Sequence, residues 1–162
     1  MARRTRPEAT DAAGRTARRH CRGLVAAVLA AAIARPAAAE PHFQPRPLPA
    51  HVYSGGWEHF VGGGVAAFDC DGDLLPELYA AGGAGQARLL RNRSEPGGGL
   101  AFAEGTPEAL ALTGVTGAYP LDIDGDGRLD LAVLRVGPDV LLRGLGDCDF
   151  APFEDLGFAS GD

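Results

Sequence analysis

Short apolar segments, separated by turns rich in glycine, proline and aspartate, make up residues 63–153 of this 162-residue chain. The run at 129–134 is nearly continuous in its apolar character, which is typical of a strand buried on both faces. Glycine and proline between the segments mark turns. The pattern therefore predicts an all-β chain with strands at 65–69, 78–82, 87–92, 100–104, 117–122, 129–136, 139–143 and 149–153.

Two connections and one aromatic segment complete this prediction. The glycine-rich residues 82–85 are predicted to form a turn. Residues 107–112 are predicted to link the two sets of strands, with room for one helical turn. Upstream of the strands, Trp57 and Phe60 are predicted to cover the inner edge of the first set, because aromatic side chains bury large apolar areas.

The most unusual stretch is 122–130, where four aspartates stand among two glycines. Like charges this close repel each other by a few kcal/mol per pair at an effective dielectric constant of ~20. Calcium reverses that cost, because it binds six to eight oxygen atoms, including carboxylates and backbone carbonyls. The alternative is a solvated turn, since aspartate and glycine are common in turns, although a turn seldom needs four acids. The predicted calcium ligands are Asp122, Asp124, Asp126, the carbonyl of Arg128, and Asp130.

A second copy of this stretch lies about 50 residues upstream, at 69–77, with its acids in the same register. The flanking sequences also match, since Leu89-Leu-Arg91 corresponds to Leu141-Leu-Arg143. A fixed period of 20–50 residues is the signature of a repeat architecture. The predicted ligands of this first loop are Asp69, Asp71, Asp73, the carbonyl of Leu75, and Glu77.

These motifs carry a resemblance to a known family. The sequences Gly-Gly-Gly-Val-Ala-Ala-Phe-Asp-Cys-Asp-Gly-Asp and Asp-Ile-Asp-Gly-Asp-Gly-Arg-Leu-Asp-Leu resemble the FG-GAP/VCBS repeat, which forms the blades of integrin α-chain β-propellers. The triple glycine and the segment 89–92 are most similar to cartilage-acidic-protein and ASPIC/UnbV-type extracellular proteins. The resemblance covers about residues 60–155. The first loop departs from the family pattern, because Leu74 replaces a glycine, Pro76 precedes the last ligand and Glu77 replaces an aspartate.

The resemblance implies about two four-stranded blades of an incomplete β-propeller of the seven-bladed type. A signal peptide helix, described below, is expected to precede them. Propellers typically need four to eight blades to close and to protect their strand edges. We therefore expect a piece of a larger propeller, with possible self-association through open blade edges. The predicted organisation is a signal peptide at 1–39, a proline-rich leader at 40–62, repeats at 63–112 and 113–153, and the start of a further repeat at 154–162.

The first 39 residues have the pattern of a secretory signal peptide. An arginine-rich segment precedes a short apolar run at 23–34, and Ala37 and Ala39 supply the small residues of a cleavage site. The alternative is a buried alanine-rich helix, and a membrane span is not expected because it needs ~20 apolar residues. Eight of the 15 basic residues and two of the 21 acidic ones lie here, so the remaining chain carries a formal charge of −12. Nucleic acid is therefore not an expected partner.

Two of the three cysteines, Cys70 and Cys148, lie beyond the predicted signal peptide. In an oxidising compartment they invite a bridge between the two blades. The alternative is a pair of free or partly buried thiols.

The function indicated by these features is that of a secreted or periplasmic calcium-binding scaffold, with an extracellular protein or glycan as its partner and with calcium in a structural role. An enzymatic function is not predicted, and the alternative is a fragment of an extracellular propeller enzyme whose catalytic residues lie in other blades. A calcium sensor of the EF-hand or dockerin type requires an acid at loop position 12. That position is Val133 or Ala80, both apolar, and predicted strands flank the loops in place of helices, so this class is not expected.

Overall fold

The structure is a computed structural model that describes residues 41–60 and 62–160. The chain divides into two compact units, Met1–Gln44 and Pro45–Asp162, and the fold described below belongs to the second unit. The predicted signal peptide at 1–39 lies outside the described residues. The elements are η1 (Trp57–His59), β1 (Val65–Phe68), β2 (Glu77–Ala80), β3 (Gly83–Gln86), β4 (Arg88–Asn92), β5 (Phe102–Glu104), η2 (Glu108–Leu110), β6 (Thr113–Leu121), β7 (Asp130–Arg135), β8 (Val140–Gly146) and β9 (Asp149–Pro152).

The first sheet is antiparallel and has the strand order β1-β2-β4-β5. Its first hairpin places Phe68 opposite Glu77, so the residues between them form the first acidic loop. Buried and exposed residues alternate along β1, because successive side chains of a strand point to opposite faces. The sheet therefore presents one face to the core and carries the acidic loop at its end.

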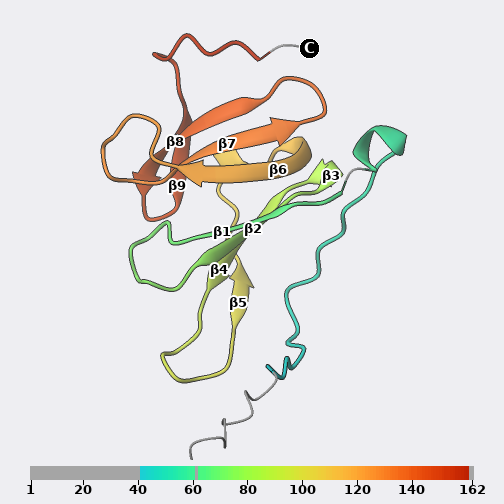
Figure 1. Ribbon diagram of the computed structural model, residues 1–162, viewed down its shortest axis with the longest axis vertical. Coiled ribbons are helices and arrows are strands. Elements are labelled where there is room, and N and C mark those ends of the chain that lie inside the picture. The colour runs from blue at the N-terminus through green and yellow to red at the C-terminus, as the bar shows by residue number, and fades with distance from the viewer. Residues whose placement is uncertain (1–40, 61, 161–162) are drawn as a thin grey trace, which may run out of the picture. The chain divides into compact units, whose positions relative to one another are not determined.

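The second sheet has the strand order β3-β6-β7-β8-β9 and is also antiparallel. Its long hairpin places Leu121 opposite Asp130, which brackets the second acidic loop in the same way. The edge strand β3 comes from the first predicted repeat, between β2 and β4 of the first sheet, but it pairs with β6 of the second sheet. Figure 1 shows β3 beside β6, whereas β2 and β4 continue into the first sheet. The two sheets are thus connected twice: by the segment between β5 and β6, and by β3, which leaves the first sheet to pair with the second.

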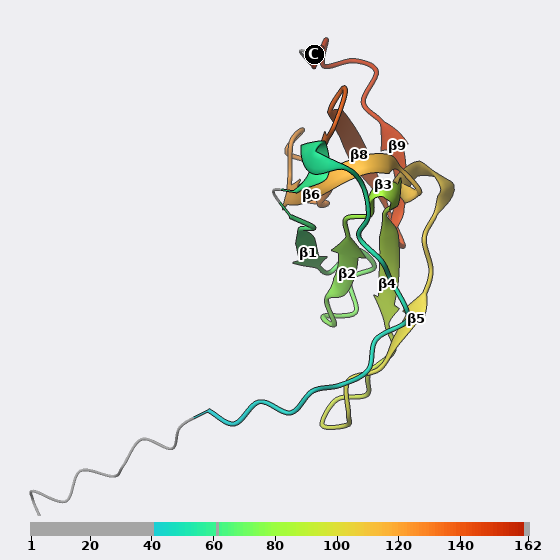
Figure 2. The same cartoon turned by 90° about the vertical axis from the view of Figure 1, so that its right-hand side faces the viewer.

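The hydrophobic core lies between the two sheets. Phe68 of β1 and Phe150 of β9 meet edge to face, with ring centroids 6.3 Å apart. Tyr79 of β2 is fully buried, and its hydroxyl donates a hydrogen bond of 2.9 Å to the carbonyl of Leu110 in the connecting segment. Burial raises the pKa of Tyr79 well above its usual range. Figure 2 shows the two sheets from the side, with the segment that follows β5 leading to β6 of the second sheet.

The predicted all-β class is confirmed, and an observed strand overlaps each of the eight predicted strands. The predicted link at 107–112 contains one 3-10 turn, η2. The predicted turn at 82–85 is confirmed, since the Gly85 N–H donates a 3.1 Å hydrogen bond to the Gly82 carbonyl in the connection between the paired strands β2 and β4. Residues 83–86 also form the short strand β3, which was not predicted. The prediction that Trp57 and Phe60 cover the first blade is wrong, since their side chains are 82% and 76% exposed.

Candidate metal centres in two acidic loops

The second acidic loop is organised by Asp122, which follows the last residue of β6. One oxygen, Oδ1, accepts hydrogen bonds from the backbone N–H of Gly125 at 2.7 Å and of Asp126 at 3.1 Å. The other, Oδ2, accepts one from Gly127 at 3.0 Å. Gly127 has φ +86°, a conformation that glycine adopts without steric cost. The loop therefore wraps around the first aspartate.

The last acid of this loop, Asp130, is fully buried at the start of β7. Its Oδ2 accepts a 2.8 Å hydrogen bond from Ile123 N–H, and its Oδ1 accepts one of the same length from Gly144 N–H on β8. These donors are neutral, so they orient the carboxylate without cancelling its charge. A buried charge needs an opposite charge or a metal ion to offset its desolvation. The geometry thus fits an ion bound beside Asp130.

Three of the four predicted carboxylates of the second loop gather at one point. Oxygen atoms of Asp122, Asp124 and Asp130 all lie within 4.8 Å of one another. Asp126 is not part of this group; its two oxygens contact the backbone N–H of Arg128 at 2.8 Å and the guanidinium of the same residue at 3.1 Å. The predicted role of the Arg128 carbonyl stays a prediction.

The first loop repeats this construction between β1 and β2. Asp69 accepts hydrogen bonds from Gly72 N–H at 2.7 Å and from Leu74 N–H at 2.9 Å. Leu74 has φ +68° at the place where the second loop has Gly127. Oxygen atoms of Asp69, Asp71 and Glu77 lie within 4.8 Å of one another. As in the second loop, three acids come together and the remaining one lies outside the group.

That remaining acid is Asp73, whose Oδ1 accepts a 2.8 Å hydrogen bond from Leu75 N–H. Asp126 makes the equivalent contact with Arg128 in the second loop. The predicted roles of Asp73 and of the Leu75 carbonyl as calcium ligands stay predictions.

Glu77, like Asp130, is fully buried at the start of its strand. Its Oε2 accepts a 3.1 Å hydrogen bond from Cys70 N–H, and its Oε1 accepts one of 3.3 Å from Asn92 N–H on β4. Burial raises the pKa of Glu77, and the nearby carboxylates of Asp71 and Asp73 add to this rise, against the two backbone hydrogen bonds. A bound cation would offset both the desolvation cost of the buried Glu77 carboxylate and its repulsion by the neighbouring carboxylates.

Each acidic group also receives one arginine from a neighbouring strand. Arg91 of β4 lies 3.3 Å from Asp71, and Arg143 of β8 lies 2.9 Å from Asp124. The sequence showed these arginines as matching positions of the repeat, but no role was predicted for them. Each arginine orients the second acid of its loop. A single guanidinium offsets only one of the clustered negative charges, so the remaining negative charge still favours a divalent ion.

The donor set in both loops fits calcium. It consists of carboxylate oxygens, which are hard ligands, and each ionised carboxylate has about four lone-pair sites. The backbone N–H bonds described above therefore leave acceptor capacity on every one of the grouped acids. A third group formed by Cys70, Glu77 and Cys148 is not a metal site of this kind, because the two sulfurs are bonded to each other.

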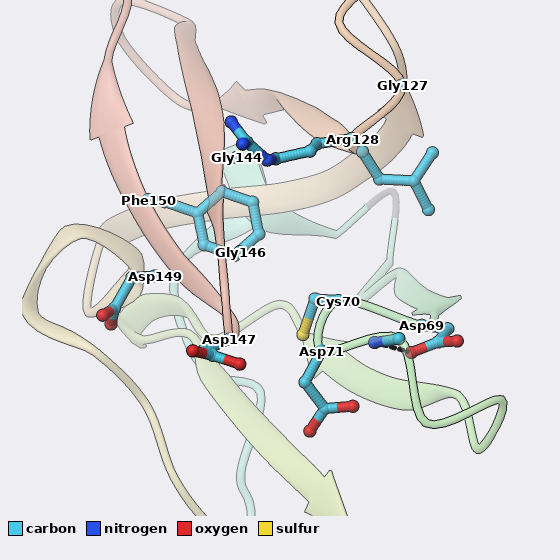
Figure 3. Close-up of a pocket in the computed structure, with 12 residues that line it drawn as sticks. Asp69, Cys70, Asp71, Gly127, Arg128, Gly144, Gly146, Asp147, Asp149 and Phe150 are labelled. Carbon is cyan, nitrogen blue, oxygen red and sulfur yellow. Dashed lines mark hydrogen bonds between the residues drawn. The ribbon is translucent and has the colours of Figure 1, made fainter.

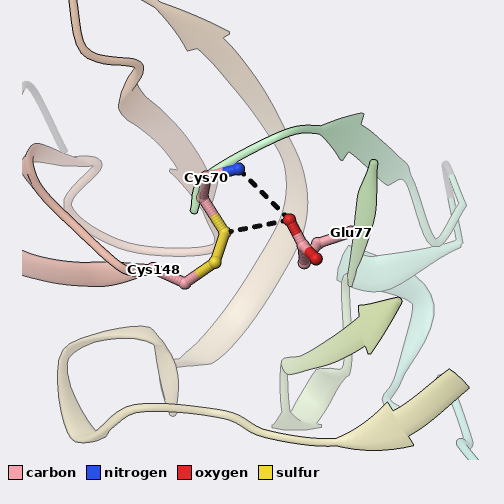
Figure 4. A group of neighbouring side chains, drawn as sticks. All are labelled: Cys70, Glu77 and Cys148. Atoms are coloured by element: carbon pink, nitrogen blue, oxygen red, sulfur yellow. Dashed lines mark hydrogen bonds between the residues drawn. A yellow bond between two sulfur atoms is a disulfide. The ribbon is translucent and has the colours of Figure 1, made fainter. Parts of the chain in front are cut away.

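Cys70 and Cys148 form a disulfide, with their Cα atoms 4.7 Å apart. The bond joins the first acidic loop to the turn between β8 and β9, and the Cys148 N–H also donates a 3.1 Å hydrogen bond to the Cys70 carbonyl. Figure 4 shows Glu77 beside the bridge, with its Oε2 3.4 Å from the Cys70 sulfur. Of the two alternatives drawn from the sequence, the bridge between the repeats is confirmed.

Comparison with known proteins agrees with this repeat geometry. Residues 69–133 match the model of the FG-GAP-like repeat, a range that begins at the first acid of the first loop and ends inside β7. This match supports an FG-GAP-like repeat protein with a β-propeller-like fold, as the two sheets indicate. Neither the curated proteins nor the solved structures gave a match. The closer similarity to ASPIC/UnbV-type proteins stays a prediction.

The part of the chain that the structure describes contains no helix with the length and apolar character that a bilayer crossing requires. The disulfide indicates an oxidising environment, since such bonds persist in secreted and periplasmic proteins.

Proposed function

We propose that this chain is an exported, calcium-binding segment of a β-propeller that serves as an extracellular binding scaffold. The observation that carries the proposal is the convergence of Asp122, Asp124 and the buried Asp130 within 4.8 Å at the end of a hairpin. Three carboxylates this close repel one another, and a divalent cation among them offsets that repulsion more fully than the single guanidinium of Arg143 does.

Calcium in this role is structural. In the second loop Asp122, Asp124 and Asp130 would hold the ion, and in the first loop Asp69, Asp71 and Glu77 would do so. Each set joins the two ends of a hairpin, because one acid follows the first strand and another begins the second strand. Binding to the folded state alone stabilises that state by mass action. The ion would therefore fix one hairpin in each sheet.

Export agrees with this role. Extracellular calcium modules bind at about 10⁻⁴–10⁻³ M, so their sites fill outside the cell. The disulfide and the predicted signal peptide at 1–39 support the same compartment. We propose an extracellular protein or a glycan as the partner. FG-GAP-like repeats are generally non-catalytic, which favours a scaffold over the alternative of a propeller-enzyme fragment.

Calcium-dependent unfolding tests this proposal. The full chain is heated in calcium and in a chelator, and the unfolding temperature is expected to be higher in calcium. In Asp122→Ala this difference should shrink, because the residue that organises the loop is removed. Glu95→Gln is the matched control, because it removes one exposed carboxylate from a turn outside both loops. Equal unfolding temperatures in calcium and chelator for the unchanged chain would contradict the proposal.

A further inference from the structure

The first acidic loop and the β8–β9 turn share an unusual backbone feature. Leu74, Asp147 and Cys148 have φ values of +68°, +50° and +61°, and they are the non-glycine residues with positive φ among those that the structure describes. Such conformations are strained for residues with a Cβ atom. All three belong to the two segments that the Cys70–Cys148 bond joins. The disulfide thus connects two strained segments.

The second acidic loop has no equivalent of this connection. Ile123 occupies the position of Cys70, and Gly127 occupies the position of Leu74. Glycine adopts positive φ freely, so the second loop reaches its conformation without outside support. The first loop requires the same conformation from a leucine whose side chain is 85% exposed and packs against nothing that would hold it. The Leu74 N–H bonds to Asp69 at 2.9 Å, and Asp69 is next to Cys70, so the bridge at Cys70 helps to maintain the first loop.

The contacts of the bridge show how it does so. Cys70 N–H bonds to Glu77, so the residue that carries the disulfide also positions the closing acid. Arg91 bonds through one guanidinium nitrogen to Asp71 and through the other to the carbonyl of Asp147, at 3.3 Å and 2.6 Å. Two of the three grouped acids of the first loop are therefore positioned by residues that are tied to the β8–β9 turn.

We propose that the disulfide makes the first loop a redox-dependent cation site, whereas the second loop binds its cation in either redox state. The inference rests on the proposed calcium-binding function. With the bond formed, Leu74 stays in its strained conformation and the three acids stay together. With the bond broken, Leu74 relaxes, Asp71 and Glu77 separate, and the affinity of the first loop falls. We expect a decrease of about tenfold, which corresponds to about 1.4 kcal/mol.

The redox step is a thiol–disulfide exchange with a dithiol. One thiolate of the dithiol attacks a protein sulfur and forms a mixed disulfide; its second thiol then displaces the protein. Two electrons pass from the dithiol to the bridge, giving two protein thiols and one cyclic disulfide. Cys148 is buried, but Cys70 lines a cavity of about 340 Å³ together with Asp69, Asp71 and Asp147. Figure 3 shows the Cys70 sulfur facing this space, which gives a reductant access.

Calcium titration of single-site variants tests the proposal. Asp124→Ala weakens the second loop and leaves the first to be measured, whereas Asp71→Ala does the reverse. Each full-length variant is titrated calorimetrically with calcium, oxidised and after reduction with dithiothreitol. The dissociation constant of Asp124→Ala should rise about tenfold on reduction, and that of Asp71→Ala should not change. Leu74→Gly in the Asp124→Ala background should reduce the redox effect, because glycine removes the strain that the bridge opposes.

The outcomes separate this inference from the function on which it rests. If Asp124→Ala binds calcium equally well in both redox states, the redox dependence is wrong and calcium binding stands. If reduction abolishes binding in Asp71→Ala as well, the bridge supports the whole fold and the selective effect is wrong. If neither oxidised variant nor the unchanged chain binds calcium, the proposed function itself is wrong.

Discussion

Glu77 and Asp130 make the same two backbone contacts at the same place in two different sheets. Each acid accepts one N–H bond from the second residue of its own loop and one from the strand that pairs with it. The glutamate is one methylene longer, yet its carboxylate still lies within 4.8 Å of Asp69 and Asp71. The substitution in the first loop therefore preserves the position of the acid.

Replacing the buried acid of the second loop tests this contact. In Asp130→Asn, one of the two N–H donors faces an amide NH₂ group in place of an oxygen. A buried donor without an acceptor costs about 1–3 kcal/mol. We expect a loss of stability of at least this size, measured by urea unfolding in calcium, where the ion offsets the buried charge of Asp130 in the unchanged chain. A change within about 0.5 kcal/mol, as is usual for surface substitutions, would contradict the buried contact.

The close approach of β8 to the second loop predicts a strong effect at Gly144. A Cβ atom there would lie 2.2 Å from the carbonyl oxygen of Leu129, so backbone must move to accommodate alanine. Overpacking of this kind typically costs about 1–3 kcal/mol, and we expect Gly144→Ala to be destabilised to this extent in urea unfolding. Gly117→Ala is the control, because its Cβ meets nothing within 4 Å and its φ is not positive. Equal stabilities of the two variants would argue against this close approach of β8 to the loop.

Exchanging Leu74 and Gly127 between the two loops measures the energetic cost of a positive φ at this position. A Cβ at Gly127 meets nothing within 4 Å, so Gly127→Leu introduces the cost of a left-handed conformation without a clash. That cost is about 1–2 kcal/mol per residue. We expect Gly127→Leu to lower the calcium affinity of the second loop and its stability accordingly.

The reverse change, Leu74→Gly, should raise the calcium affinity of the first loop, since the leucine side chain is exposed and little packing is lost. Calcium titration measures both variants. Opposite signs are expected, and a gain of affinity in Gly127→Leu would contradict the assignment of strain.

The contact between Arg143 and the second loop predicts a further effect on stability. Arg143 contacts Asp124 at 2.9 Å and stacks its guanidinium on Phe153 at 4.5 Å. In Arg143→Met the apolar stem remains but the positive charge is lost, so the clustered acids repel each other more strongly. We expect lower stability in a chelator and a larger stabilisation by calcium than in the unchanged chain. Thermal unfolding with and without calcium measures this, and an unchanged calcium effect would show that Arg143 does not offset the charge of the loop.

The sequence predicted the parts of the fold that depend on local patterns. Each acidic hairpin consists of two apolar strands on either side of an acidic turn. Both strands and the turn lie within one short segment, so local sequence is enough to predict them. β3 was missed because Gly83–Gln86 has no apolar side-chain pattern. Its partner, β6, lies in the other repeat. Pairing of this kind depends on tertiary structure and not on local sequence preference.

The candidate site was predicted to a similar extent. The acids could be identified because four of them in nine residues are costly without a cation. The roles of Arg91 and Arg143 could not, because an arginine on a strand gives no sign of which loop it will reach. The disulfide was one of two alternatives, since the distance between Cys70 and Cys148 depends on how the two sheets pack.

The most direct test of the account is a crystal structure of the chain grown in millimolar calcium. We expect an ion among Asp122, Asp124 and Asp130, with oxygen ligands at about 2.3–2.6 Å. Water alone between these three carboxylates, at a resolution that distinguishes water from calcium, would contradict the account.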